Sequence, residues 1–263
     1  MNKPVPRFQQ RRERRQFFRA GLGLAAGGAL AGCDAISHSD MAVEVLRSAE
    51  GLSESVHRLL GRRAMAQEFA PADIAPVFRP NGTTMPPGPD YAAMVADGFA
   101  KWRLKVDGLV RQPQAWSLEQ LRAMPARTQI TRHDCVEGWS CIGQWTGVRL
   151  SHVLRLAQPA PTAKFVVFHC LDRMEAADPA SVYYESIDMD DALHEQTILA
   201  WDLNGRPLPV ANGAPLRARI ERQLGYKQPK YVHRIELVAN FAAIGGGLGG
   251  YWEDQGYNWY GGI

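Results

Sequence analysis

The sequence predicts an α+β domain with a mixed sheet. Short segments with alternating apolar residues, typical of half-buried strands, are interspersed with short segments of helical periodicity. The two kinds do not follow the regular strand–helix rhythm of a parallel α/β fold, and no internal repeat is visible. With 263 residues, 46% hydrophobic and 22% charged, the chain has the composition of a globular protein with a sizeable core.

The net charge is unevenly distributed along the chain. Residues 1–32 contain seven Lys or Arg and one acid, for a net charge of +6, which leaves −3 for the remainder because the whole chain carries +3. A mildly acidic body gives no reason to expect a nucleic-acid partner.

Residues 1–33 are predicted to be an export signal. The basic start is followed over 20–32 by Ala, Gly and Leu, a stretch too short and too rich in glycine for a stable membrane span. The run 14–19 (RRQFFR) resembles the twin-arginine motif, whose route exports folded proteins. We therefore expect a periplasmic location. A basic Sec-type signal or a disordered arm is the alternative.

The end of this signal resembles a lipoprotein processing box. Residues 30–33 (LAGC) place small residues before Cys33, so we expect either a lipid anchor on Cys33, and with it attachment to a membrane, or plain cleavage before His38. The following segment, 34–100, is predicted to be an N-terminal extension. It contains a helix over 44–66, where apolar residues recur at helical spacing, and an irregular loop over 78–88, which is dense in Pro and Gly.

A compact domain is expected over 101–240. Residues 102–110 alternate between apolar and polar side chains and predict its first strand. A short helix over 117–124 follows, because Ser117 can cap it and Gln120 completes a capping box.

Around the middle of this domain, residues 128–136 predict a strand, the Gly-rich segment 137–147 a loop, and 150–156 a helix. The apolar run 165–168 predicts a buried strand, and 183–187 a further strand.

The domain then closes with two further strands. A helix is expected over 189–194, a strand over 197–200, and a hairpin-type turn over 203–209, where Asn-Gly occurs. Alternation over 232–238 predicts the last strand. Residues 241–263, rich in Gly, Trp and Tyr, are expected to form a C-terminal segment that wraps around the domain.

Cys135 is the centre of chemical interest. It leaves a predicted strand for a Gly-containing turn, where a thiolate can be presented, and Arg132 and His133 beside it are candidates to lower its pKa. With Cys33 assigned to the signal, three cysteines remain, so a disulfide framework is not expected.

The residues alone leave several interpretations of Cys135 open. It can be a buried structural cysteine, a nucleophile paired with His133, or a ligand of a transition metal such as molybdenum. Zinc is a weaker candidate, because its other potential ligands lack paired spacing; they are His133, Cys141, His169 and Cys170.

Two ordered blocks resemble the sulfite-oxidase-type molybdopterin-dependent oxidoreductases. The run 134–140 (DCVEGWS), with 145–148 (WTGV) after it, resembles the family's molybdenum-ligand segment. Residues 208–217 and 225–232 resemble its pterin-phosphate segment in order and spacing. The resemblance covers about 102–238 and implies a single molybdopterin-binding α+β domain.

The resemblance implies a set of cofactor contacts. Cys135 would be the molybdenum ligand, and a molybdenum–molybdopterin cofactor would perform two-electron oxygen-atom transfer. The other contacts implied are Asn81, Thr84, Met85, Cys170, Asn212, Arg217, Gln228, Pro229 and Lys230, with a Cys at 170 where relatives have Thr. Glu137 and His133 are candidates to assist proton delivery, or are structural hydrogen-bonding groups.

Departures from the family pattern bear on the substrate. Asn212 stands where sulfite oxidases have His, which resembles the bacterial periplasmic sulfoxide-reductase branch. Glu137 and Trp139 after the ligand Cys suit a sulfite dianion poorly, because a desolvated anion needs cationic partners. A small S-oxide or N-oxide is the expected substrate, with sulfite oxidation as the alternative.

The remaining expectations concern partners and rival functions. No haem-binding His pair is recognisable before residue 100, so electrons would pass to or from a separate partner, a membrane haem protein or a cytochrome. The rivals are a lipid-anchored binding protein without turnover and a metal-free thiol enzyme that uses Cys135 and His133.

Overall fold

The computed structural model describes residues 39, 51–59, 61 and 64–263. The predicted signal and Cys33 lie outside these residues, as does the first part of the helix expected over 44–66. The chain divides into two units, 1–60 and 61–263. In the first, 51–59 is helical as predicted, whereas 64–66, at the start of the second, has no regular secondary structure. Among the described residues no helix is both long enough and apolar enough to span a membrane.

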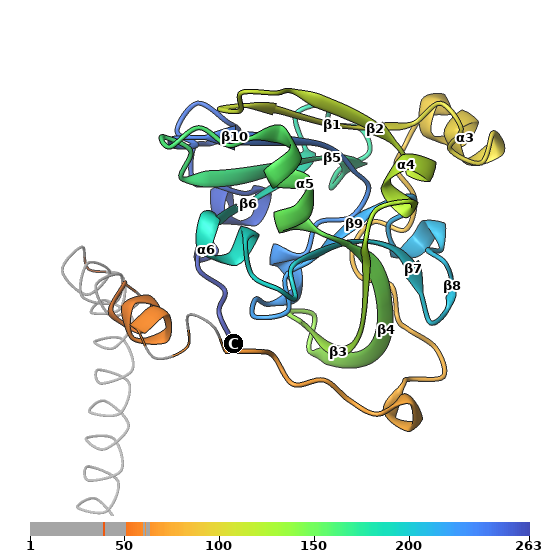
Figure 1. Cartoon of the computed structure of the whole chain (residues 1–263), viewed down its shortest axis with the longest axis horizontal. Coiled ribbons are helices and arrows are strands. Elements are labelled where there is room, and N and C mark those ends of the chain that lie inside the picture. Colours follow the sequence, from red (N-terminus) through yellow and green to blue (C-terminus); the bar gives the residue numbers. More distant parts are fainter. Residues whose placement is uncertain (1–38, 40–50, 60, 62–63) are drawn as a thin grey trace, which may run out of the picture. The chain divides into compact units, whose positions relative to one another are not determined.

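The unit 61–263 contains two five-stranded sheets (Figure 1). The first has the order β2-β1-β10-β5-β6, and its strands are β1 Arg103–Gly108, β2 Gln114–Ser117, β5 Phe165–Arg173, β6 Val182–Asp188 and β10 Val232–Val238. Strands β1 and β10 pair in parallel and the others antiparallel. The predicted α+β class with a mixed sheet is therefore confirmed.

The second sheet has the order β3-β4-β7-β8, with β9 also paired to β7. Its strands are β3 Ala126–Cys135, β4 Trp139–Arg149, β7 Ile198–Leu203, β8 Arg206–Pro207 and β9 Arg217–Arg219. Strands β7 and β8 form the predicted hairpin, whose turn places Asn204 and Gly205 at φ values of 52° and 72°. Positive φ at both positions is what an Asn-Gly turn provides.

Short helices connect and cover the sheets; they are α3 Pro89–Ala96, α4 Leu118–Arg122, α5 Leu150–Ala157, α6 Met189–Ala192 and α7 Tyr251–Asp254, with 3-10 turns at η1 Pro71–Asp73, η2 Val210–Asn212 and η3 Gly225–Lys227. The predicted capping box of α4 is present, with Gln120 N donating to Ser117 Oγ at 3.1 Å and Ser117 N to Gln120 Oε1 at 2.8 Å. Helix α5 buries four of its eight residues and contacts both β1 and β4, so it bridges the two sheets.

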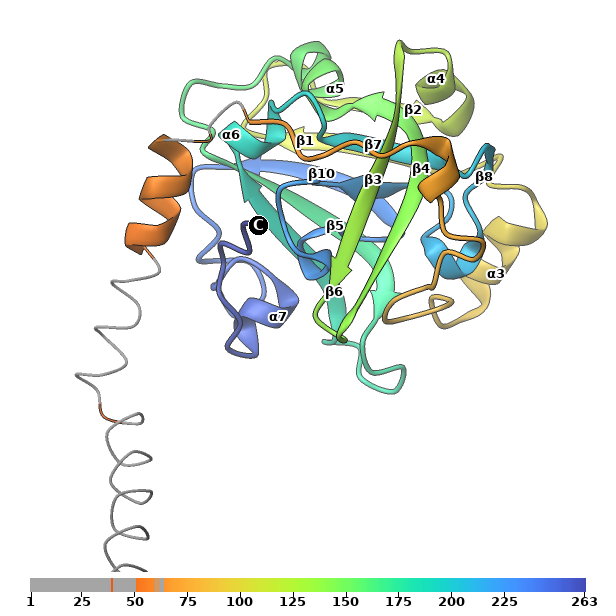
Figure 2. The same cartoon turned by 90° about the horizontal axis from the view of Figure 1, so that it is seen from below.

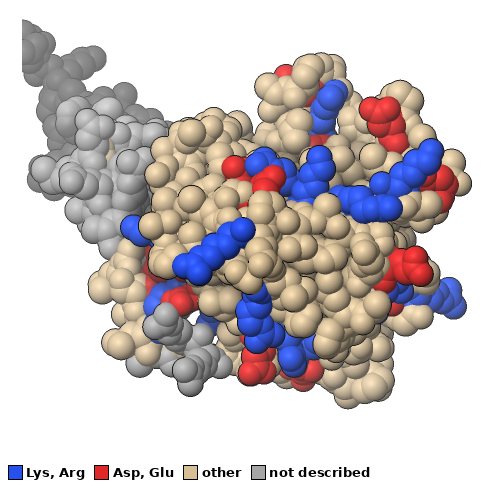
Figure 3. Space-filling view, turned by 45° about the horizontal axis from the view of Figure 1, so that its top comes forward, with Lys and Arg blue, Asp and Glu red and all other residues tan. Residues whose placement is uncertain are grey.

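The main apolar core lies where the two sheets and α5 meet. Fully buried side chains come from β1, β5 and β10 of the first sheet, from β7 and β9 of the second, and from α5; examples are Leu104, Phe168, Leu237, Leu199, Ala218 and Leu154. On the outside of this unit, acidic and basic side chains are interspersed over the face shown in Figure 3.

The loop predicted over 137–147 is wrong beyond residue 138, because 139–147 belongs to β4. Only 136–138 forms a turn. The glycines that suggested a loop serve close packing in a strand: a Cβ at Gly147 would lie 2.1 Å from the carbonyl oxygen of Leu199, and one at Gly143 2.8 Å from Phe78. At Gly147 the neighbouring backbone of β7 leaves no room for a side chain, and at Gly143 the Phe78 ring would have to move.

A buried lysine between two buried carboxyl groups holds the C-terminal segment against the first sheet. The ammonium of Lys227 contacts Glu185 on β6 and lies 2.6 Å from Glu253 Oε1 on α7, and all three side chains are at most 1% exposed. Trp259 Nε1 donates to the Ser186 hydroxyl at 2.8 Å. The C-terminal segment expected over 241–263 thus packs on β6, and its helix α7 was not predicted from the sequence.

Candidate functional site

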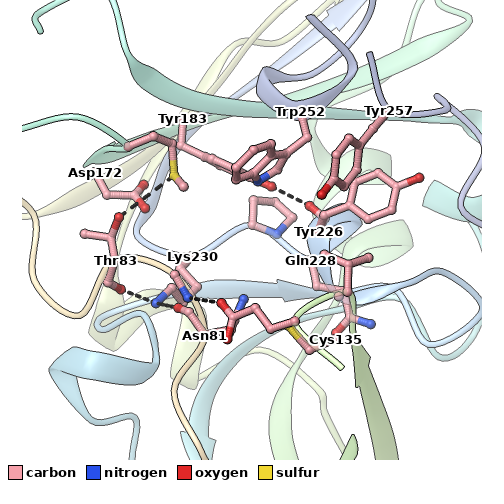
Figure 4. A pocket seen from close by; sticks show the side chains of 16 residues that line it. Asn81, Thr83, Cys135, Asp172, Tyr183, Tyr226, Gln228, Lys230, Trp252 and Tyr257 are labelled. Carbon is pink, nitrogen blue, oxygen red and sulfur yellow. Dashed lines mark hydrogen bonds between the residues drawn. The ribbon is translucent and has the colours of Figure 1, made fainter. Parts of the chain in front are cut away.

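A cavity of about 260 Å³ lies where distant segments of the unit 61–263 meet. Its walls come from 81–83, from the turn after β3, from the end of β5, from 225–230, and from Trp252 and Tyr257 in the C-terminal segment. Figure 4 shows their side chains converging on this space. In Figure 2 the ends of the β3–β4 and β5–β6 hairpins lie at the same end of the unit, and residues at both ends line the cavity.

Cys135 is the last residue of β3 and faces the cavity, as the sequence predicted for a residue at a turn. The turn is closed by Gly138, whose φ is 86° and whose N–H donates to the Cys135 carbonyl at 3.0 Å. Burial raises the pKa of the Cys135 thiol, and the charge of Glu137 adds to this, while the backbone N–H of Glu137 opposes it. A metal ion is one partner that would hold this thiol as a thiolate.

His133 does not supply the positive charge that the sequence suggested for lowering the pKa of Cys135. Its side chain is fully buried, and burial lowers its own pKa well below the ordinary range, with Arg219 and Arg217 adding to the effect. Arg219 Nη1 lies 2.9 Å from His133 Nδ1. Nδ1 also lies 3.3 Å from Gln228 Oε1, a contact that raises the pKa of His133 but is outweighed by burial, so the imidazole is neutral.

The loop 81–83 is tied to the rest of the cavity wall from two sides. Lys230 Nζ donates to the carbonyl oxygens of Asn81 at 2.6 Å and Ala211 at 3.1 Å, and also to that of Thr83. On the other side, Glu137 Oε1 accepts from the Gly82 N–H at 3.1 Å.

Glu137 is engaged at both of its carboxylate oxygens. Besides the contact with Gly82, its Oε2 accepts from Trp139 Nε1 at 3.0 Å. The Trp139 contact and then the Gly82 contact lower the pKa of Glu137. The side chain is exposed at the cavity mouth and ionised at neutral pH.

Arg217 lies fully buried behind the wall. Its guanidinium donates to the carbonyl oxygens of Asn212 at 3.2 Å and Gln228 at 3.3 Å, and its centre is 5.1 Å from the ring of Trp145. Burial and the neighbouring Arg219 lower its pKa to about 9, so it remains charged at neutral pH.

The residues named from the sequence fall into three groups. Those that line the cavity are Asn81, Cys135, Glu137, Gln228, Pro229 and Lys230. Those that are buried nearby without lining it are His133, Cys170, Asn212 and Arg217. Thr84 and Met85 are exposed and do not line the cavity; the adjacent Thr83 does.

Sequence reasoning missed part of the lining, chiefly Asp172, Met174, Tyr183, Tyr226, Trp252 and Tyr257. Asp172 was missed because the strand predicted over 165–168 continues to Arg173. The aromatic residues of the tail were noted as a group, but only tertiary packing brings two of them to the cavity.

Buried polar atoms around the cavity fit a polar cofactor. Among the described residues, several have no hydrogen-bond partner: Asn81 Oδ1, His133 Nε2, Asp172 Oδ1, Asn212 Nδ2 and Arg217 Nε. Each such atom costs about 1–3 kcal/mol unless a bound group satisfies it. The set contains acceptors and donors, as a heterocycle with a phosphate requires.

The same residues do not form a metal site by themselves. Within the described part of the chain, no three His, Cys, Asp or Glu side chains are arranged to bind one ion. The zinc interpretation of His133, Cys135, Cys141, His169 and Cys170 is therefore wrong for these residues. A metal bound through Cys135 would take its other ligands from a cofactor.

Comparisons with known proteins show the family of the chain. A family model described as an oxidoreductase molybdopterin-binding domain matches residues 92–242. An Azospira oryzae protein, YedZ1, whose name assigns it to a protein-methionine-sulfoxide reductase as a subunit, is 37% identical over 265 residues, which is 99% of this chain and 92% of that protein.

Other relatives match over a shorter region. The protein-methionine-sulfoxide reductase catalytic subunit MsrP of Xanthomonas campestris is 38% identical over 152 residues, 53% of this chain and 46% of MsrP. The chain thus spans less than half the length of that relative. The sulfane dehydrogenase SoxCD of Paracoccus pantotrophus gives a TM-score of 0.48 at 23% identity, over 54% of this chain and 39% of that one.

Proposed function

The chain belongs to the family of oxidoreductases with a molybdopterin-binding domain, and on this premise we propose that it is the exported catalytic subunit of an enzyme that reduces a small, neutral S-oxide. Names of the relatives support the S-oxide, since YedZ1 and MsrP are both named for protein-methionine-sulfoxide reductases. An N-oxide is the second candidate.

The cofactor would be held by residues on two sides of the cavity. Cys135 would bind molybdenum through its thiolate, and Lys230, with backbone near Gln228, would face the pterin phosphate, while Arg217 would add its charge from behind the cavity wall. Asn81 and Asn212 have the unpartnered amide atoms that a pterin ring can pair with. When bound, this cofactor supplies two-electron oxygen-atom transfer.

One observation carries the choice of a neutral substrate: the ionised carboxylate of Glu137 stands at the cavity mouth, two residues from Cys135. Of the cations nearby, Lys230 donates to three backbone carbonyls and Arg217 to two. The guanidinium of Arg79, whose charge also acts on Cys135 and Glu137, lies over the Trp139 ring. The Glu137 carboxylate would repel a sulfite dianion, whereas a sulfoxide carries no charge. Exposed Val136 and Tyr257 add apolar surface at the rim.

The test begins with molybdenum, phosphorus and zinc analysis of protein from a host that makes molybdopterin. We expect molybdenum and phosphorus near one per chain and no stoichiometric zinc. Loaded enzyme is then assayed for methionine sulfoxide and trimethylamine N-oxide reduction with reduced viologen, and for sulfite oxidation with ferricyanide. Preferential reduction of the sulfoxide supports the proposal.

Other outcomes favour the rivals. Faster sulfite oxidation would make this a sulfite oxidase, and Glu137→Gln should then have little effect on sulfite affinity. Bound molybdenum without redox cycling would indicate a binding protein. A molybdenum-free protein that is active only with a free Cys135 thiol would be a thiol enzyme.

Location and redox partner are part of the same proposal. The twin-arginine-like run at 14–19 supports export to the periplasm, and the lipoprotein-like run before Cys33 supports a lipid anchor. The word subunit in the relatives' names supports a separate electron-transfer partner, a membrane haem protein or cytochrome. Cell fractionation of the wild type and Cys33→Ser tests this: we expect the variant to leave the membrane fraction.

A further inference from the structure

Asp172 is a buried acid at the cavity that is not among the proposed contacts of molybdenum or the pterin phosphate. It belongs to the end of β5, is 3% exposed, and lines the same cavity as Cys135. We propose that Asp172 is the proton donor in the reduction of the S-oxide. The proposal rests on the proposed function and names the residue that protonates the departing oxygen.

Local backbone geometry brings Asp172 to the cavity. The pairing of β5 with β6 shifts register between His169 and Arg173, and the pairing with β10 shifts beside Cys170. Such irregularities redirect side chains and are frequent beside active sites. In Figure 4 the carboxyl group of Asp172 stands near Thr83, across the cavity from Cys135. Its Oδ1 has no hydrogen-bond partner among the described residues and is therefore available to a bound molecule.

The surroundings of Asp172 favour its protonated form. Lys230 is the charged group that acts on it, while Cys170, Tyr91, Tyr183 and Tyr231 are the titratable groups that sense its charge. Burial raises the pKa of Asp172 to about 7, against the opposing effects of Lys230 and the Thr83 hydroxyl. Burial and Arg217 lower the pKa of Lys230 to about 7 in turn. With a pKa of about 7, the Asp172 carboxyl can donate a proton at neutral pH.

The two acids suggested by the sequence are less suited to this role. Glu137 has a lowered pKa and both its oxygens are engaged, so it holds no proton at neutral pH. His133 does not line the cavity, and its Nε2 faces Gly225, where a Cβ would come within 2.7 Å of it.

The sulfoxide takes up two electrons and two protons, its S–O bond breaks, the sulfur keeps an electron pair as the sulfide, and the oxygen leaves as water. One proton comes from the Asp172 carboxyl and the other from solvent, which afterwards reprotonates Asp172. A low-potential one-electron donor, reduced viologen in the assay, supplies the two electrons.

The test compares Asp172→Asn, Asp172→Glu and the exposed control Asp97→Asn in molybdenum-loaded protein. We expect kcat/KM of the wild type to fall as pH rises through about 7, because the protonated acid is the active form. In Asp172→Asn, kcat/KM should be lower than in the wild type by about 100-fold or more at lower pH, and it should not fall further as pH rises through about 7. Asp172→Glu should recover part of the rate, and the control should match the wild type.

A readout independent of turnover accompanies the assay. Infrared spectra of the loaded protein should contain a protonated-carboxyl band that titrates near pH 7, is absent in Asp172→Asn, and remains in Asp97→Asn. Molybdenum and phosphorus contents and the thermal midpoint should match those of the wild type in Asp172→Asn, so that the loss reflects proton supply.

Several results would overturn the proposal. An unchanged pH profile in a fully loaded Asp172→Asn variant, or a carboxyl band that titrates near pH 7 in it with the wild-type intensity, would each remove Asp172 from this role while leaving the proposed function intact. A wild type that is loaded with molybdenum but reduces no S-oxide would instead remove the proposed function, and the proposal with it.

Discussion

Lys230 Nζ lies 2.6 Å from the carbonyl oxygen of Asn81, a residue 149 positions earlier in the chain. The Tyr231 hydroxyl supports the same loop, because it donates to the Thr83 carbonyl at 3.1 Å. The segment resembling the pterin-phosphate block and the irregular loop near residue 81 are therefore one structural element at the cavity.

Lys230→Met should loosen this element. The loop carbonyls would lose their donor in a partly buried site, so we expect a loss of about 1–3 kcal/mol in the free energy of unfolding and a lower molybdenum content. Urea denaturation and metal analysis measure the two effects. The exposed Lys101→Met is the control. Equal stability and equal cofactor content in both variants would contradict the loop's dependence on Lys230.

Cys135→Ser should abolish activity while the pterin remains. The hydroxyl is a poor substitute for a soft thiolate on molybdenum, but the phosphate contacts lie on other segments. We expect loss of the thiolate-to-molybdenum absorption with phosphorus content retained. Cys141→Ser is the matched control. Among the described residues, the Cys141 thiol makes one hydrogen bond, to the Val77 carbonyl at 3.7 Å. Full activity in Cys135→Ser would exclude the ligand role.

Glu185→Gln should change how stability depends on pH. Burial raises the pKa of Glu185 well above its ordinary value, with Glu253 adding to the effect and Lys227 opposing it. The folded state therefore holds a proton that the unfolded state releases, so the contribution of Glu185 to stability is greatest at low pH and declines as pH rises above the ordinary carboxyl pKa.

We expect this decline to be smaller in Glu185→Gln, because the glutamine carries no titrating proton. Denaturation at about pH 5 and about pH 8 compares the two proteins, with the exposed Glu119→Gln as control. A decline of equal size in Glu185→Gln and the wild type would assign the effect to another group.

Gly147→Ala should destabilise the second sheet. The new Cβ would lie 2.1 Å from the Leu199 carbonyl oxygen and 2.6 Å from the Ala200 Cα, where β4 and β7 shift register. These backbone atoms cannot move aside without distorting the sheet. We therefore expect the free energy of unfolding to fall by about 1–3 kcal/mol or more, measured from the urea midpoint. Gly61→Ala, whose Cβ would have its nearest neighbour at 3.7 Å, should have little effect. Similar midpoints for the two variants would contradict the packing argument.

The sequence predicted the elements whose information is local. The capping box of α4 and the Asn-Gly turn of β7–β8 were predicted correctly, because each depends on residues adjacent in the chain. The fold class followed from mixed periodicities in the same way. Cys135 at a turn after a strand was predicted for the same reason.

Features that depend on distant neighbours were predicted less well. The glycines at 143 and 147 suggested a loop because nothing in the sequence reveals that Phe78 and Leu199 press against them. Thr83 rather than Thr84 lines the cavity. This depends on which loop carbonyls Lys230 binds, and one of them is that of Thr83. The site roles of the sequence-named residues stay predictions.

The cavity wall also sets an order of events during synthesis. A chain leaving the ribosome presents Asn81 first, Cys135 later, and Trp252 and Tyr257 only after most of the unit has emerged. Until then the cavity lacks the part of its wall that these two residues form. Glu253 of α7 has also not yet reached Lys227, which contacts Glu185. A ligand that needs this wall must therefore be captured after translation of these residues, by a chain that is already folding around it.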